Sequence, residues 1–135
     1  MTETYRIRVS LDHISEEVYR DIYVPKDTLL SVLKDAILKF FGLNRKMIAS
    51  FFLCNEHGDS EEEIISEELG EEGFRTLNQV TFAQVVEQKK NLVFAAHGIK
   101  MRFFHVEILG KKLEDLNMPK LEKTHGQIPR NDKKN

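Results

Sequence analysis

Two stretches near the N-terminus alternate between apolar and polar residues, which is the pattern of half-buried β-strands. In the first stretch, apolar side chains occupy every second position from Tyr5 to Leu11. In the second stretch, Val18, Ile22 and Val24 fall on one face of an extended chain. The short polar connection between the two stretches predicts an antiparallel hairpin.

A proline and a new apolar spacing predict a helix over about Leu29–Phe41. Pro25 ends the second strand because it cannot donate to a ladder, and Asp27 or Thr28 can cap the helix. Gly42 is placed to take the left-handed conformation that follows a helix end. The predicted buried stripe of this helix consists of Leu29, Leu33, Ala36, Ile37 and Phe40.

The second half of the chain predicts mainly strands. The apolar run 49–54 reads as a strand, whereas residues 60–66 fit a helix start and a short strand equally well. Thr81 and Gln84 form a capping box for a short helix, with Val80 and Val85 as a hydrophobic staple. Residues 92–96 and 101–109 then read as a hairpin around the turn 97–100.

This last hairpin is apolar on both faces. If Gly98 and Ile99 lie at the centre of the turn, Phe104 and the apolar residues that follow it face the core. The other face needs a cover, from elsewhere in the chain or from a partner, and it provides the candidate partner-binding surface: Leu92, Phe94, Met101 and Phe103.

The elements together predict a single α+β domain over residues 1–112, with a mixed or antiparallel sheet and one helix packed on one face. Their order resembles a β-grasp arrangement or an α-β roll. An acidic excursion spans about residues 55–75. Residues 113–135 read as a polar, basic and mobile tail that the fold does not need, because they lack a periodic apolar pattern.

Composition narrows the class of protein. The chain has 135 residues, a net charge of -2 and one cysteine, Cys54, so no internal disulfide or multi-cysteine zinc site is possible. A lone thiol fits a reducing cytoplasm. The N-terminus is not a signal peptide, and no apolar run is long enough for a membrane-spanning helix. We therefore expect a cytoplasmic protein without a membrane association.

The sequence contains no recognisable catalytic, cofactor-binding or metal-binding constellation. His105 and Glu107 share a strand face but lack a third ligand, so we interpret them as polar residues on a solvated face. Cys54 precedes an acidic segment that disfavours a thiolate. We expect no cofactor and no enzymatic activity.

A surface for nucleic acid is the alternative reading. Arg6, Arg8 and Arg20, with Tyr19 and Tyr23, can place guanidinium and aromatic groups on a sheet. Arg20 has the opposite parity to both tyrosines, so the five side chains need not share one face. A solvated polar sheet face is the simpler interpretation, and nucleic acid is possible but not favoured as a partner.

The block Val18–Leu43 resembles the plasmid pRiA4b Orf3-like family, whose members are also described as passenger TnpR proteins of an insertion element. The matching positions are Tyr19-Arg20, Ile22, Val24-Pro25, Thr28-Leu29, Leu33, Ile37 and Phe41-Gly42, with Leu43 where the family has Trp. The resemblance covers about residues 4–110. It departs in residues 94–101, where relatives carry an acidic pair, a Trp and a His. Any polar site that those residues build in relatives is therefore not expected here.

The resemblance implies a link with mobile elements, but the chain shows no recombinase-like residues and no helix-turn-helix domain. We therefore expect a non-catalytic module that binds a protein partner, with a homo-oligomer as a further option. The alternative is a nucleic-acid-associated protein of a mobile genetic element.

Overall fold

A computed structural model describes residues 1–12 and 14–129 of the chain. The described residues form one seven-stranded sheet, and every strand pairing in it is antiparallel. The strands are β1 (Thr2–Leu11), β2 (Tyr19–Pro25), β3 (Ile48–Cys54), β4 (Ser60–Ile65), β5 (Asn91–His97), β6 (Met101–Glu114) and β7 (Lys120–His125). Their spatial order is β4-β3-β5-β6-β1-β2-β7.

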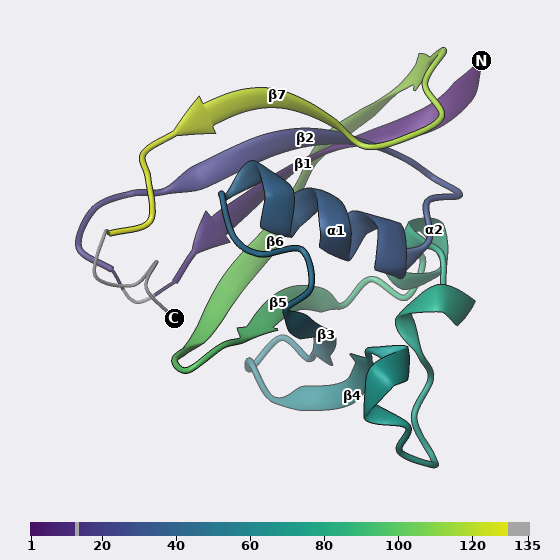
Figure 1. Cartoon of the computed structure of the whole chain (residues 1–135). Coiled ribbons are helices and arrows are strands. Elements are labelled where there is room, and N and C mark those ends of the chain that lie inside the picture. The colour runs from purple at the N-terminus through teal and green to yellow at the C-terminus, as the bar shows by residue number, and fades with distance from the viewer. Residues whose placement is uncertain (13, 130–135) are drawn as a thin grey trace.

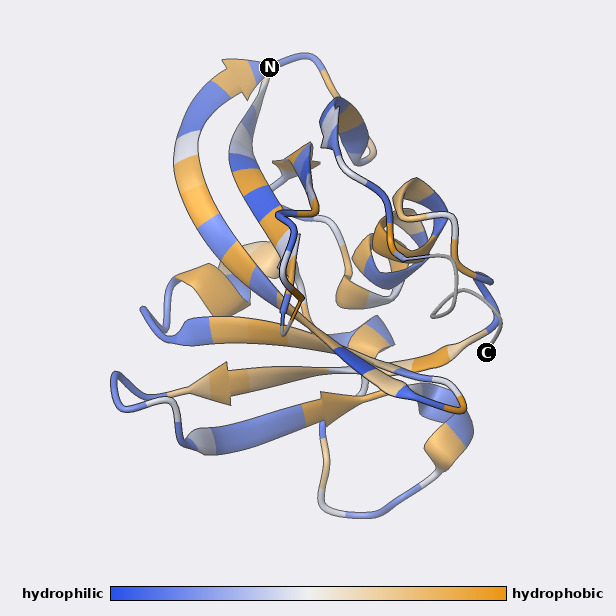
Figure 2. Ribbon diagram, turned by 90° about the vertical axis from the view of Figure 1, so that its left-hand side faces the viewer, coloured by the Kyte–Doolittle hydropathy of each residue, from blue (hydrophilic) through white to orange (hydrophobic). Residues whose placement is uncertain are grey.

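The sheet is strongly curved, and the helix α1 (Leu30–Phe40) lies across its concave side (Figure 1). A single α+β domain with an antiparallel sheet and a helix on one face was the sequence prediction, and the structure confirms it. The finer comparison with a β-grasp arrangement is not confirmed. Figure 2 shows apolar and polar residues alternating along several strands, as a sheet with one buried face requires.

The first hairpin and the end of α1 follow their local signals. Strands β1 and β2 pair in the register Ile7↔Ile22, and both side chains are fully buried. Gly42 has φ 73°, and its N–H donates to the Lys39 carbonyl while that of Leu43 donates to the Leu38 carbonyl. These two bonds are the Schellman motif, which satisfies carbonyls at the helix end.

The start of α1 differs from the prediction. The helix begins at Leu30, and neither Asp27 nor Thr28 caps it with a side chain. Instead, the Leu30 N–H donates to the Val80 carbonyl at 2.9 Å, and the Phe82 N–H donates to the Thr28 carbonyl at 2.8 Å. The main-chain segments that lead into the helices at Leu30 and Phe82 therefore cap each other. No local sequence signal predicts this contact, because the two segments are far apart in the chain.

The buried face of α1 is also rotated from the predicted stripe. Leu33 and Ile37 are fully buried as expected, but Leu29 is exposed and Ala36 and Phe40 are only half-buried. The side chains that complete the buried face are Leu30, Lys34 and Leu38, with Phe41 just beyond the helix end. Part of the predicted core stripe consequently lies on the surface.

The capping box at Thr81 begins the short helix α2 (Phe82–Val86), as predicted. Gln84 N–H donates to Thr81 Oγ1 at 3.3 Å, and Thr81 N–H donates to Gln84 Oε1 at 2.9 Å.

We expect Thr81→Ala to lower the free energy of unfolding by about 1 kcal/mol, because it removes this N-cap. Denaturant melts measure the change, with Thr124→Ala on the exposed strand β7 as the control. A loss at Thr81 no larger than that of the control would show that the box is not needed.

The acidic excursion and the C-terminal region complete the sheet. Residues 60–65 form strand β4, which resolves the helix-or-strand ambiguity, and a 3-10 turn η1 (Glu67–Leu69) follows. A second 3-10 turn, η2 (Leu77–Gln79), precedes α2.

The prediction of a tail without fixed structure from residue 113 is wrong for most of that tail. Strand β6 continues to Glu114, and β7 pairs with β2 along one edge of the sheet. Ile128 is 2% exposed and belongs to the core. Residues 130–135 of the predicted tail lie outside the described residues.

Candidate interaction surface

The β5–β6 hairpin has a register one residue away from the predicted one. Phe94 pairs with Phe104 and His97 pairs with Met101, so three residues close the turn instead of two. A one-residue slip moves every side chain of a strand to the other face. Leu92 and Phe94 are therefore in the core, and the predicted partner-binding surface of Leu92, Phe94, Met101 and Phe103 does not form.

The face of the hairpin that points away from α1 carries a different set of apolar side chains. Strand pairing places Phe52 beside Val93 on this face, and Phe103 pairs with Ala95. Met101 is 42% exposed, and the other larger members are half-buried. We name this surface the hairpin patch: Phe52, Val93, Met101 and Phe103.

The sequence could not identify Phe52 and Val93 as surface residues. Residues 92–96 are apolar at every position, so the pattern does not say which alternate set faces the core. The turn length decides the register of a hairpin, and Gly98 fits both turn lengths. Two members of the predicted surface, Met101 and Phe103, remain on this face.

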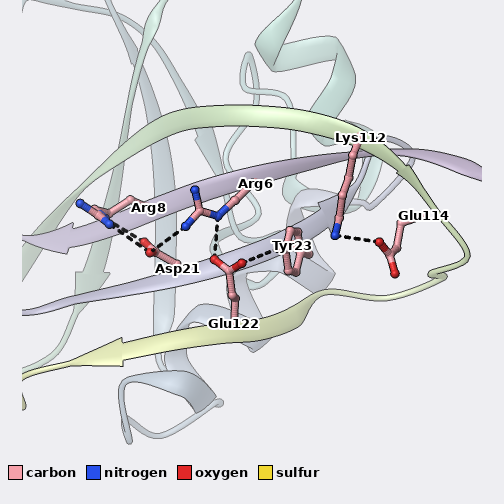
Figure 3. Close-up of polar contacts among 7 residues, drawn as sticks. All are labelled: Arg6, Arg8, Asp21, Tyr23, Lys112, Glu114 and Glu122. Atoms are coloured by element: carbon pink, nitrogen blue, oxygen red, sulfur yellow. Dashed lines mark hydrogen bonds and ion pairs between the residues drawn. The ribbon is translucent and has the colours of Figure 1, made fainter.

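The candidate nucleic-acid residues do not form one surface. Arg6 and Arg8 lie on the outer face of β1, where their guanidinium groups meet carboxylates (Figure 3). Arg8 donates to both oxygens of the buried Asp21, at 2.8 and 3.0 Å, and this bond raises the pKa of Arg8. Arg6 donates to Glu122 at 2.7 Å.

The pairing extends over the neighbouring strands. The Tyr23 hydroxyl donates to Glu122, and this bond, more than the bond from Arg6, holds the pKa of Glu122 below its usual value. Lys112 pairs with Glu114 at 2.9 Å beside the same tyrosine (Figure 3). Arg6, Arg8 and Lys112 are therefore already paired with carboxylates, and phosphate groups would have to compete with these carboxylates.

Arg20 points to the opposite side of the sheet and is 4% exposed. Its Nε donates to the Phe40 carbonyl at 2.8 Å, and its Nη1 donates to the carbonyls of Tyr19, His125 and Gly126. The guanidinium lies 4.7 Å from the centre of the Phe41 ring. Arg20 therefore joins the end of α1 to the end of β7 and is not available to a ligand.

The side chains that could act as nucleophiles are either protonated or buried. Burial raises the pKa of the Cys54 thiol, and Asp59 and Glu61 raise it further, which disfavours a thiolate at neutral pH. The Ser50 hydroxyl lies 3.3 Å from Nε2 of His97, but Ser50 is fully buried.

A hollow of about 420 Å³ borders Cys54 and His105 where β6 separates from β5. Two of its polar side chains already have partners: Lys90 pairs with Glu61, and the Asn91 amide donates to the Asn55 carbonyl at 3.2 Å. His105 Nε2 lies 3.2 Å from Asp12, not from a second metal ligand such as Glu107.

Within residues 1–12 and 14–129, no three His, Cys, Asp or Glu side chains gather closely enough to hold a metal ion. In the same ranges, no helix combines the length and the apolar character needed to cross a membrane.

Comparisons with known proteins agree with the resemblance seen in the sequence. A family model described as plasmid pRiA4b ORF-3-like protein matches residues 3–132, which extends the predicted match beyond residues 4–110. The curated proteins contain no match to this chain. A crystal structure of a protein of unknown function from Methanosarcina mazei Go1 is similar in fold, with a TM-score of 0.79 and 14% sequence identity. The match covers 98% of this chain and 76% of that one.

Proposed function

This chain belongs to the plasmid pRiA4b ORF-3-like family, and on that premise we propose that it is a non-catalytic protein-interaction module of the cytoplasm. The observation that carries the proposal is the hairpin patch. It places exposed Met101 beside half-buried aromatic and aliphatic side chains on the sheet face opposite α1. Apolar patches of this kind, rimmed by polar residues, are typical of protein contacts. The lone protonated thiol of Cys54 fits a reducing compartment.

The environment of the three candidate arginines supports a protein partner over a nucleic acid. The cations that the sequence offered to phosphates are paired with carboxylates or buried in the fold. His97 and His105 flank the patch and add polar groups at its rim. The analogy with a β-grasp arrangement rests on element order alone and adds nothing to this proposal.

The matched variants Met101→Glu and Ile108→Glu test the proposal. Both residues lie on β6 and are 42% exposed, but they are on opposite faces of the strand. We expect immobilised wild-type protein and Ile108→Glu to capture the same partner from an extract of the source cells. Met101→Glu should lose that partner, because a charge in the patch has to be desolvated on binding.

Thermal melts of the two variants provide the control for folding. Both should keep an unfolding free energy within about 1 kcal/mol of the wild type, because partly exposed positions tolerate polar side chains. Equal capture by both variants at two salt concentrations would contradict the proposed use of the hairpin patch. Capture that weakens steeply with salt, and that Met101→Glu leaves intact, would favour nucleic acid instead.

A further inference from the structure

The solvent-facing side of α1 carries a second apolar feature, which the hairpin patch does not include. Val32, Ala36 and Phe40 follow one another at four-residue spacing along this side, and we name them the helix stripe. Val32 is 43% exposed, and the other two are half-buried. A hollow of about 140 Å³ lies along the stripe, bordered by Met118 and Pro119 of the β6–β7 connection. Figure 1 shows α1 on the outside of the fold, in front of the sheet.

The order of residues along the stripe is self-complementary. Val32 and Phe40 are equally distant from Ala36, so an antiparallel second copy of α1 would place Val32 of each chain against Phe40 of the other. The small side chain of Ala36 at the centre would let the two helices approach closely. Such an arrangement has a two-fold axis near Ala36, as an isologous dimer requires.

The charges beside the stripe follow the same symmetry. Asp35 and Lys39 are both exposed and lie on one flank of the stripe. In the antiparallel arrangement, Asp35 of each copy would face Lys39 of the other. Among the described residues, neither side chain forms an ion pair within its own chain.

From this complementarity of shape and charge, we propose that the chain forms a two-fold dimer through the helix stripe of α1. One helix face and the adjacent loop bury less than the roughly 1,200 Å² that marks a standard stable interface, so the dimer should be weak and concentration-dependent. The proposal does not depend on the hairpin patch, which stays free in such a dimer because it lies on the other side of the sheet.

Sedimentation of the purified full-length chain over a range of concentrations tests the proposal. We expect a monomer–dimer equilibrium for the wild type. Asp35→Lys should weaken it by at least about fivefold, because two attractive pairs become repulsive. The double variant Asp35→Lys, Lys39→Asp should restore most of the association by reversing both partners. Asp27→Lys is the matched control, because it makes the same charge change at an exposed residue outside the stripe.

Two results would overturn the dimer. One is a chain that remains monomeric up to about 1 mM. A dissociation constant above that concentration corresponds to a binding free energy weaker than about -4 kcal/mol. The other is a dimer that both Asp35→Lys and the double variant leave unchanged. If Met101→Glu dissolves such a dimer instead, the hairpin patch is the contact, which supports the proposed function and refutes this inference.

Discussion

Ending the chain at Glu114 is expected to lower the free energy of unfolding by more than about 5 kcal/mol, or to abolish the cooperative transition. The deletion removes β7, which pairs with β2 from Tyr19 to Tyr23. It also removes Ile128, which is almost fully buried. Most importantly, it removes two of the carbonyl groups that accept hydrogen bonds from the buried guanidinium of Arg20.

The close fit of the segment after β7 explains why its loss cannot be repaired locally. Gly126 has φ 71°, and a Cβ atom at this position would lie 2.7 Å from the Glu17 carbonyl oxygen. The chain therefore packs directly on the residues that lead into β2. In the truncated protein, water would have to replace these contacts.

Chemical denaturation of the truncated and full-length chains measures this effect. Ile128→Ala in the full-length chain separates the packing contribution, for which we expect about 2–4 kcal/mol. A truncated chain that unfolds within about 1 kcal/mol of the full-length protein would show that residues 115–135 are dispensable, as their composition suggests.

Local signals predicted the first hairpin, the end of α1 and the start of α2. The alternation around Ile7 and Ile22, the left-handed Gly42 and the capping box of Thr81 all depend on residues close together in the chain. Patterns of this kind report local structure directly, and here local and tertiary preferences agree. The family resemblance rests on the same segment.

Strand β7 could not be predicted in this way. It carries one half-buried apolar residue, Leu121, and a bulge next to Asp21 breaks its register with β2. Its place in the sheet depends on the free edge of β2 and on Arg20, which are about 100 residues away in the chain. A short stretch of sequence around β7 includes neither β2 nor Arg20, so its pattern cannot reveal the pairing.

The prediction of the candidate surface was limited in a different way, because the pattern was right and the register was not. The sequence correctly indicated that the β5–β6 hairpin is apolar on both faces, but a turn one residue longer exchanged the two faces. Phe94 and Phe104 then pack against each other in the core, with tilted rings whose centres are 5.7 Å apart. Only two of the four predicted surface residues stayed on the surface side.

Replacing Arg20 with Met should lower the free energy of unfolding by about 3–5 kcal/mol. Met keeps the apolar stem but removes every donor. The Phe40 carbonyl at the end of α1 and the His125 and Gly126 carbonyls would lose a charged partner in a buried environment. Desolvation lowers the pKa of Arg20, so the guanidinium depends on these acceptors for its stability in the folded state.

Two further variants distinguish this role from a general loss of charge. Arg6→Met removes an arginine that is 41% exposed, and exposed ion pairs contribute little, so we expect a much smaller loss than for Arg20→Met. Arg20→Lys keeps the charge but not the planar fork that reaches both chain segments, so it should recover only part of the stability. Urea melts of the three variants would contradict this role if Arg20→Met cost no more than Arg6→Met. In that case Arg20 would not hold α1 and the C-terminal strand together, and the large effect expected for the truncation would have to come from β7 and Ile128 alone.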